Sequence, residues 1–196
     1  MTEPRAASRR NLILGAGKAF TGVTAAALLG GCVHGAMAQG STTSAADPAQ
    51  DVQILNAAIA LEHEGIAAYT IAAGSGLLQP AVVQVGVIFR GHHEGHRDAL
   101  IGAVRTLGGT PVAAKSTDEY VRDLDVASLR NQTDVLRLAL RLERGAANAY
   151  LSLIPSMSAD YHQVAARLAG DEAFHAAILA NALGEPIPTT PLMFGA

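Results

Sequence analysis

The sequence is poor in several residue types on which other kinds of protein depend. Its 196 residues include one cysteine, no tryptophan and only 4% aromatic residues. The single cysteine, Cys32, excludes a disulfide framework and a cysteine-based metal site. Basic residues interleaved with aromatic ones, the pattern typical of a nucleic-acid-binding surface, are also missing, so we expect no nucleic-acid partner.

Alanine and leucine dominate what is present, which suits helices packed closely through small side chains. The length is sufficient for one domain with a sizeable core. The formal net charge is −3, but the first 38 residues hold four of the 14 basic residues and one of the 17 acidic ones. Residues 39–196 therefore carry a formal charge of −6, and their acidic residues must lie either on helices or at a functional site.

The N-terminus has the order of an export signal. Arg9 and Arg10 precede a mildly apolar segment, residues 12–29, which glycines and Lys18 interrupt too often for a membrane-spanning helix. This order resembles a twin-arginine signal peptide, which we assign to residues 1–38. The mature chain is then expected to carry no integral membrane span.

Two ways of processing this signal remain open. Residues 36–38, Ala-Met-Ala, fit cleavage before Gln39, which we favour slightly. Residues 29–32, Leu-Gly-Gly-Cys, resemble a lipobox and would make Cys32 a lipid anchor. Both predict a location outside the cytoplasm: the periplasm after cleavage, or attachment to a membrane as a lipoprotein.

The rest of the chain reads as an all-α protein. Residues 39–50 are predicted to be a flexible linker, residues 51–184 a four-helix bundle, and residues 185–196 an extended proline-rich tail. Helices are expected over about 51–73, 80–107, 133–153 and 159–183, with a short one over 118–124. The long connection after the second helix is of a suitable length to cross from one end of a bundle to the other.

An internal repeat places polar residues at the centre of each apolar helix face. Leu-Glu-x6-Tyr occurs with Glu62 and Tyr69, and again with Glu143 and Tyr150. The segment Gly-His-His-x2-His of the second helix matches Gly-Asp-Glu-x2-His of the fourth. Six side chains are thereby predicted to meet at one point: Glu62, His93, His96, Glu143, Glu172 and His175. For the two tyrosines we favour core packing over a hydrogen bond to a ligand carboxylate, and we expect His92 to take no part.

This arrangement resembles the ferritin-like superfamily, and in particular exported bacterial ferritin-like domain proteins. The resemblance covers residues 51–184 and implies a site for two iron or manganese ions. It also implies roles: Glu62 and Glu143 as terminal ligands, Glu172 as a bridge, and His96 and His175 with one metal each. His93 departs from the pattern, because a second bridging glutamate is expected there.

The departure leaves three site types open: two metals bridged by Glu172 alone, one metal near His93 and His96, or imidazole–carboxylate pairs without metal. The leading hypothesis is an exported metal-binding protein with redox activity on ferrous iron or peroxide. The alternative is a non-enzymatic structural or stress-associated bundle whose polar layer binds no metal. Either kind of protein is compatible with a homo-oligomer.

Overall fold

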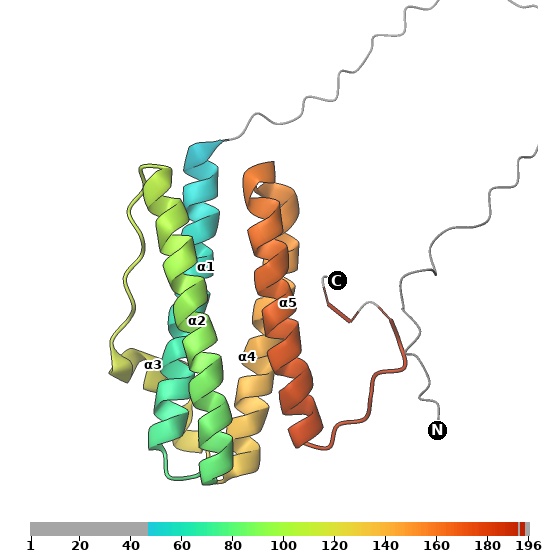
Figure 1. The fold of residues 1–196 in the computed structure, drawn as a ribbon. Helices are drawn as coiled ribbons and strands as arrows, with labels where there is room; N and C mark the ends of the chain where they lie inside the picture. The colour runs from blue at the N-terminus through green and yellow to red at the C-terminus, as the bar shows by residue number, and fades with distance from the viewer. Residues whose placement is uncertain (1–46, 192, 195–196) are drawn as a thin grey trace, which may run out of the picture. The chain divides into compact units, whose positions relative to one another are not determined.

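A computed structural model describes residues 47–191, 193 and 194, and they fold into a bundle of four long helices (Figure 1). These residues contain no β-strand, so the predicted all-α class is confirmed. The long helices are α1 (Pro48–Gly74), α2 (Pro80–Thr106), α4 (Gln132–Leu153) and α5 (Ala159–Ala182). The predicted signal peptide and Cys32 lie outside the described residues.

The chain forms two antiparallel hairpins joined by a crossover. α1 packs against α2, α4 packs against α5, and the hairpins meet mainly through α1 and α4. The crossover contains α3 (Thr117–Asp123) and the 3-10 turn η1 (Val126–Ser128), and α3 lies against α1. Figure 1 shows this connection running along the outside of the first hairpin to the start of α4, as the length of the segment predicted.

The first helix begins three residues earlier than predicted. Asp47 accepts a hydrogen bond from the backbone N–H of Ala49 at 3.0 Å, and Pro48 occupies the first helical position. An aspartate cap followed by proline is a strong helix start. The assignment of residues 39–50 to a linker is therefore wrong for residues 48–50, while residues 39–46 lie outside the described part.

One end of the bundle is filled more completely than the other. The largest apolar cluster includes Leu55, Ile59, Val104 and Tyr150, which are all essentially inaccessible to solvent. At the other end two smaller clusters form around Tyr69 and around Tyr120. On α2, Phe89 and half-buried Val82 pack into the cluster around Tyr69, whereas Val85 of the same helix is 38% exposed.

The C-terminal tail follows α5 without further helix in its described residues. Gly184 ends the helix in a left-handed conformation, with φ +70°. Arg144 forms an ion pair with Glu185 at 2.7 Å, and Phe194 packs against the cluster around Tyr69. None of the described helices is long and apolar enough to span a membrane.

Candidate metal centre

The six side chains predicted to meet do converge between the two hairpins. Each is at most 8% exposed, and Glu172 and His175 are completely buried. α1 and α4 supply one glutamate each, while α2 and α5 supply two residues each, spaced three apart on one helix face. The helical repeat therefore produces a cluster of three carboxyl groups and three imidazoles in an otherwise apolar interior.

The cluster divides into two overlapping groups of potential metal ligands. Within each group the ligand atoms all lie within 4.8 Å of one another. The first group consists of Glu62, His93, His96 and Glu172, and the second of His93, Glu143, Glu172 and His175. Glu172 and His93 belong to both, so they occupy the two shared positions of a binuclear arrangement.

His93 presents a different nitrogen to each side of the cluster. Its Nδ1 lies 2.7 Å from Glu62 Oε2, and its Nε2 lies 3.3 Å from Glu143 Oε1. Its Nδ1 is also 3.7 Å from Glu172 Oε1. His93, which stands where a glutamate was expected, thus lies inside the cluster and contacts all three carboxyl groups.

The other two imidazoles point Nδ1 inward and Nε2 outward. His96 Nδ1 lies 3.0 Å from Glu172 Oε1, and its Nε2 lies 3.1 Å from Asp171 Oδ2. His175 Nδ1 lies 3.3 Å from both Glu143 Oε2 and Glu172 Oε2. An imidazole held on its outer nitrogen by a carboxylate is the usual support of a metal-binding histidine.

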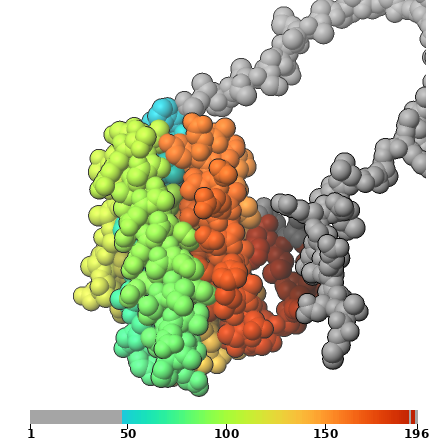
Figure 2. Space-filling model, in the orientation of Figure 1, coloured from blue at the N-terminus to red at the C-terminus, as the bar shows by residue number. Residues whose placement is uncertain are grey.

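The expectation that His92 takes no part is wrong. Its Nδ1 lies 2.9 Å from His175 Nε2, so it supports His175 as Asp171 supports His96. These two contacts join α2 to α5, which lie side by side on the face seen in Figure 2. The repeat contained the signal, because His92 and Asp171 occupy equivalent positions immediately before the shared residues His93 and Glu172.

Both tyrosines are core residues and hydrogen-bond donors at once. Tyr69 donates its hydroxyl to Glu143, and Tyr150 donates its hydroxyl to Glu62. Each tyrosine thus forms its hydrogen bond with the glutamate of the opposite hairpin, since the glutamate of its own helix is two turns away. Packing and hydrogen bonding, which the sequence offered as alternatives, are combined.

The cluster strongly shifts the ionisation of its members. Burial acts to lower the pKa of His93, but its bonds with Glu143 and Glu62 outweigh burial and raise that pKa to about 10. Burial likewise opposes Glu172 and Glu62 at His96, whose pKa is also raised to about 10. Burial would raise the pKa of Glu62 and Glu143, but the nearby imidazoles hold both below the usual range.

Glu172 is the member whose charge is least compensated. Burial raises its pKa despite hydrogen bonds from His175 and His96. Its Oε2 atom is buried and makes no well-formed hydrogen bond among the described residues, because its neighbour His175 Nδ1, at 3.3 Å, lies equally close to Glu143 Oε2. A buried carboxylate oxygen without a well-formed hydrogen bond is costly, and a cation between Glu172 and the imidazoles would remove that cost. The donor set, its outer supports and this oxygen therefore fit a metal centre.

Two further histidines of the described residues, His63 and His162, stay outside the cluster. His63 Nε2 lies 3.3 Å from the carbonyl oxygen of Val112, and His162 Nε2 lies 2.9 Å from that of Met157. Both contacts are to backbone oxygens of nearby connections rather than to the carboxylates, and neither residue belongs to a ligand group.

Comparison with known proteins agrees with this architecture. A family profile described as a ferritin-like domain matches residues 50–185. The chain belongs to this family. Among solved structures, it is similar to a conserved hypothetical protein, rv2844, from Mycobacterium tuberculosis, with 26% identity and a TM-score of 0.61. That match covers 72% of this chain and 96% of the mycobacterial one. No curated protein matches the chain.

A glycine in this ferritin-like domain makes room for His93. A Cβ atom added at Gly65 of α1 would lie 2.9 Å from His93 Nδ1. The equivalent residue of the second hairpin is Ala146, and the shared residue of that hairpin is Glu172 rather than a histidine. Glycine inside a helix costs about 1 kcal/mol relative to alanine, so its presence here is explained by the imidazole beside it.

We therefore expect Gly65→Ala to lower the free energy of unfolding by about 1–3 kcal/mol, because the new methyl group must displace a buried, hydrogen-bonded ring. Gly145→Ala on α4 is the matched control, since nothing lies within 4 Å of its added Cβ. The control should gain up to about 1 kcal/mol. Urea denaturation measures both, and equal gains would contradict the account of Gly65.

The metal-free domain should lose stability as the pH rises from about 6.5 to about 10. His93 and His96 have raised pKa values of about 10, compared with about 6.5 in an unfolded chain. Their contribution is complete below the lower value and is lost through the higher one. Urea denaturation of chelator-treated protein across this range measures the trend. His93→Gln should flatten it, and a wild-type stability that rises with pH would contradict it.

Proposed function

We propose that this ferritin-like domain binds two metal ions between its hairpins and uses them in redox chemistry. The observation that carries the proposal is the pair of overlapping ligand groups that share Glu172, a buried carboxylate with one oxygen that accepts no well-formed hydrogen bond. In this assignment Glu62 and His96 hold one ion, Glu143 and His175 hold the other, and Glu172 bridges them. His93 completes the inner layer.

The chain's own residues would fix these ligands in place. Tyr150 and Tyr69 orient the terminal glutamates through their hydroxyl groups. Asp171 and His92 hold the outer nitrogens of His96 and His175, so that the inner Nδ1 atoms face the carboxyl groups with which they would hold the ions. Such outer partners are worth about 10–100-fold in metal affinity.

Iron and manganese are the metals we propose, since carboxylate and imidazole ligands suit both. When bound, they would supply one-electron redox chemistry for the oxidation of ferrous iron or the breakdown of peroxide. Three carboxylates facing two divalent ions leave one positive charge uncompensated. Because His93 replaces a fourth carboxylate, the two metal ions should bind more weakly than at a site with four carboxylates. Their higher oxidation states should also be less accessible.

The competing function is a structural bundle whose polar layer holds no metal. The close contact of His93 with Glu62, at 2.7 Å, favours it, because imidazolium groups alone can neutralise the carboxylates. This alternative is less satisfactory at Glu172, because it leaves the buried Oε2 atom without a well-formed hydrogen bond. The two functions differ in what metal does to the folded protein, so they separate in one experiment.

Glu172→Gln should lose both metal ions, because the residue belongs to both ligand groups. Loss of an outer partner lowers metal affinity by up to about 100-fold. We expect this change to lower the affinity for Fe²⁺ or Mn²⁺ by more than that. Equilibrium dialysis followed by elemental analysis measures the bound metal. The control is Glu94→Gln on α2, whose side chain is 45% exposed and pairs with Arg90 at 3.4 Å.

Unchanged metal binding by Glu172→Gln would contradict this assignment of the site. A wild-type protein that binds no metal, and whose melting temperature responds to neither metal nor chelator, would support the structural function instead.

We further propose that the protein acts in the periplasm after twin-arginine export. The support is the sequence of residues 1–38 alone. Replacing Arg9 and Arg10 by lysine should leave the protein in the cytoplasm, as cell fractionation would show, whereas Arg5→Lys should not. Cys32→Ser tests the alternative: release of a membrane-attached protein by this change would identify a lipoprotein. Export of the double variant at the wild-type level would contradict the proposal.

A further inference from the structure

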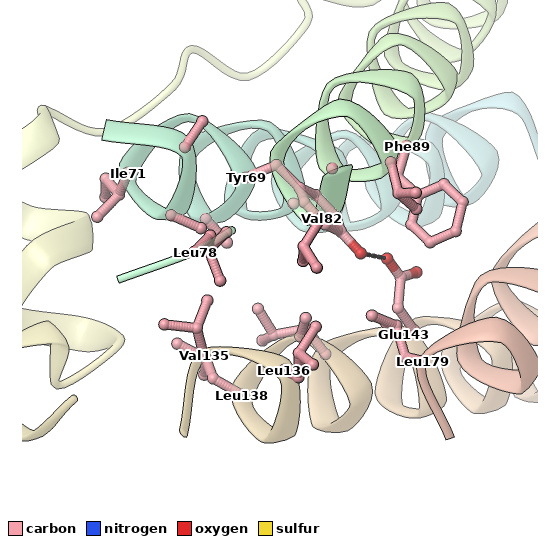
Figure 3. A pocket seen from close by; sticks show the side chains of 18 of the residues that line it. Tyr69, Ile71, Leu78, Val82, Phe89, Val135, Leu136, Leu138, Glu143 and Leu179 are labelled. Atoms are coloured by element: carbon pink, nitrogen blue, oxygen red, sulfur yellow. Dashed lines mark hydrogen bonds between the residues drawn. The ribbon is translucent and has the colours of Figure 1, made fainter. Parts of the chain in front are cut away.

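A cavity of about 310 Å³ occupies one end of the bundle, on the side of the turn between α1 and α2. Its walls come from all four long helices and from the crossover. Figure 3 shows apolar side chains surrounding this space, including Leu78, Val82 and Leu136. The same picture places the Tyr69–Glu143 hydrogen bond among the residues that line it, so the cavity reaches the candidate metal centre.

The cavity lies at one end of a bundle whose two ends are related by the internal repeat. The repeat relates Val82 to Tyr161 and Gly86 to Ala165, and in each pair the cavity has the smaller residue. Tyr161 and Ala165 belong to the tightly packed end, where they fill the core around Leu55 and Leu168. The small residues Val82 and Gly86 leave this space open. The tightly packed end, which has Tyr161 and Ala165 at the equivalent positions, shows that the same fold can fill it.

The chemistry of the walls restricts what can enter. The described lining residues include no lysine or arginine, and two of the polar ones, Glu64 and Glu143, are acidic. The imidazole of His93 is already paired with Glu62 and Glu143, so an anionic molecule would find no free partner, and any ion would exchange water for aliphatic side chains at high cost. The only polar groups of the lining at the metal centre are those of Tyr69, His93 and Glu143.

The size is appropriate for a small organic molecule. An engineered apolar cavity of about 150 Å³ accepts benzene, and this one has about twice that volume. Ligand sites of proteins begin at roughly this size and are mostly apolar with a few polar groups at one place.

We propose that this cavity is a binding site for one neutral, apolar organic molecule of about the size of naphthalene, held with one edge toward Tyr69 and Glu143. Its role as a substrate site rests on the proposed redox function, but binding itself requires only the folded domain. The test can therefore be made on metal-free protein, so that failure of the metal assignment and failure of this one are distinguishable.

The fluorescent probe N-phenyl-1-naphthylamine, which is neutral and brightens in apolar surroundings, should bind the full chain with a stoichiometry of about one, and naphthalene should displace it. Ala139→Phe places a ring inside the cavity from α4 and should weaken probe binding by about tenfold or more, because the space is then occupied. Val82→Phe fills the same space from α2 and is the second variant.

Phe174→Ser is the control for binding at the surface, since the Phe174 side chain is 58% exposed and does not line the cavity. It should bind the probe as the wild type does. The proposal is overturned if the wild type does not bind the probe, if Phe174→Ser abolishes binding, or if a folded filled variant retains full binding.

A measurement on the wild type alone makes the test independent of how the variants fold. With naphthalene added, nuclear Overhauser effects should connect its protons to the methyl groups of Val82 and Leu136, which line the cavity. Contacts confined to Ile88, which is 57% exposed on the same helix α2 and outside the cavity, would overturn the proposal.

Discussion

The structure depends on the burial of three carboxyl groups and three imidazoles at the centre of four apolar helices. Unpaired, such groups would be strongly destabilising. Hydrogen bonds from the surrounding side chains reduce this cost: the tyrosines donate to the terminal glutamates, and Asp171 and His92 hold the outer nitrogens of two histidines. The oxygen left without a well-formed hydrogen bond, Glu172 Oε2, lies in the residue that both ligand groups share.

The departures from internal symmetry are related to one another. His93 stands where symmetry calls for a glutamate, and Gly65 of the neighbouring helix provides the space for its ring. Farther along the same hairpin, Val82 and Gly86 are smaller than their counterparts and border the cavity, which His93 also lines. The first hairpin has thus diverged at the centre and at the adjoining apolar end, which is why we regard His93 as part of an altered site rather than as a lost ligand.

Much of this could be predicted from the sequence because it follows from helical spacing. The positions of Glu62, Glu143 and the residue pairs on α2 and α5 give the bundle, the crossover and the six-residue cluster. Features that depend on the contact between hairpins could not be predicted in the same way. The donation of Tyr69 to the opposite glutamate, the exposure of Val85 and the cavity are set by how the hairpins pack, which periodicity within one helix does not specify.

Metal content of the native protein tests the central claim most directly. The protein should be recovered from its own host, without added metal, and analysed for its elements. The account predicts about two equivalents of iron or manganese per chain, as for a binuclear carboxylate site. The absence of metal, together with an unchanged melting temperature on adding either ion, would contradict it and would leave the buried cluster as a structural layer.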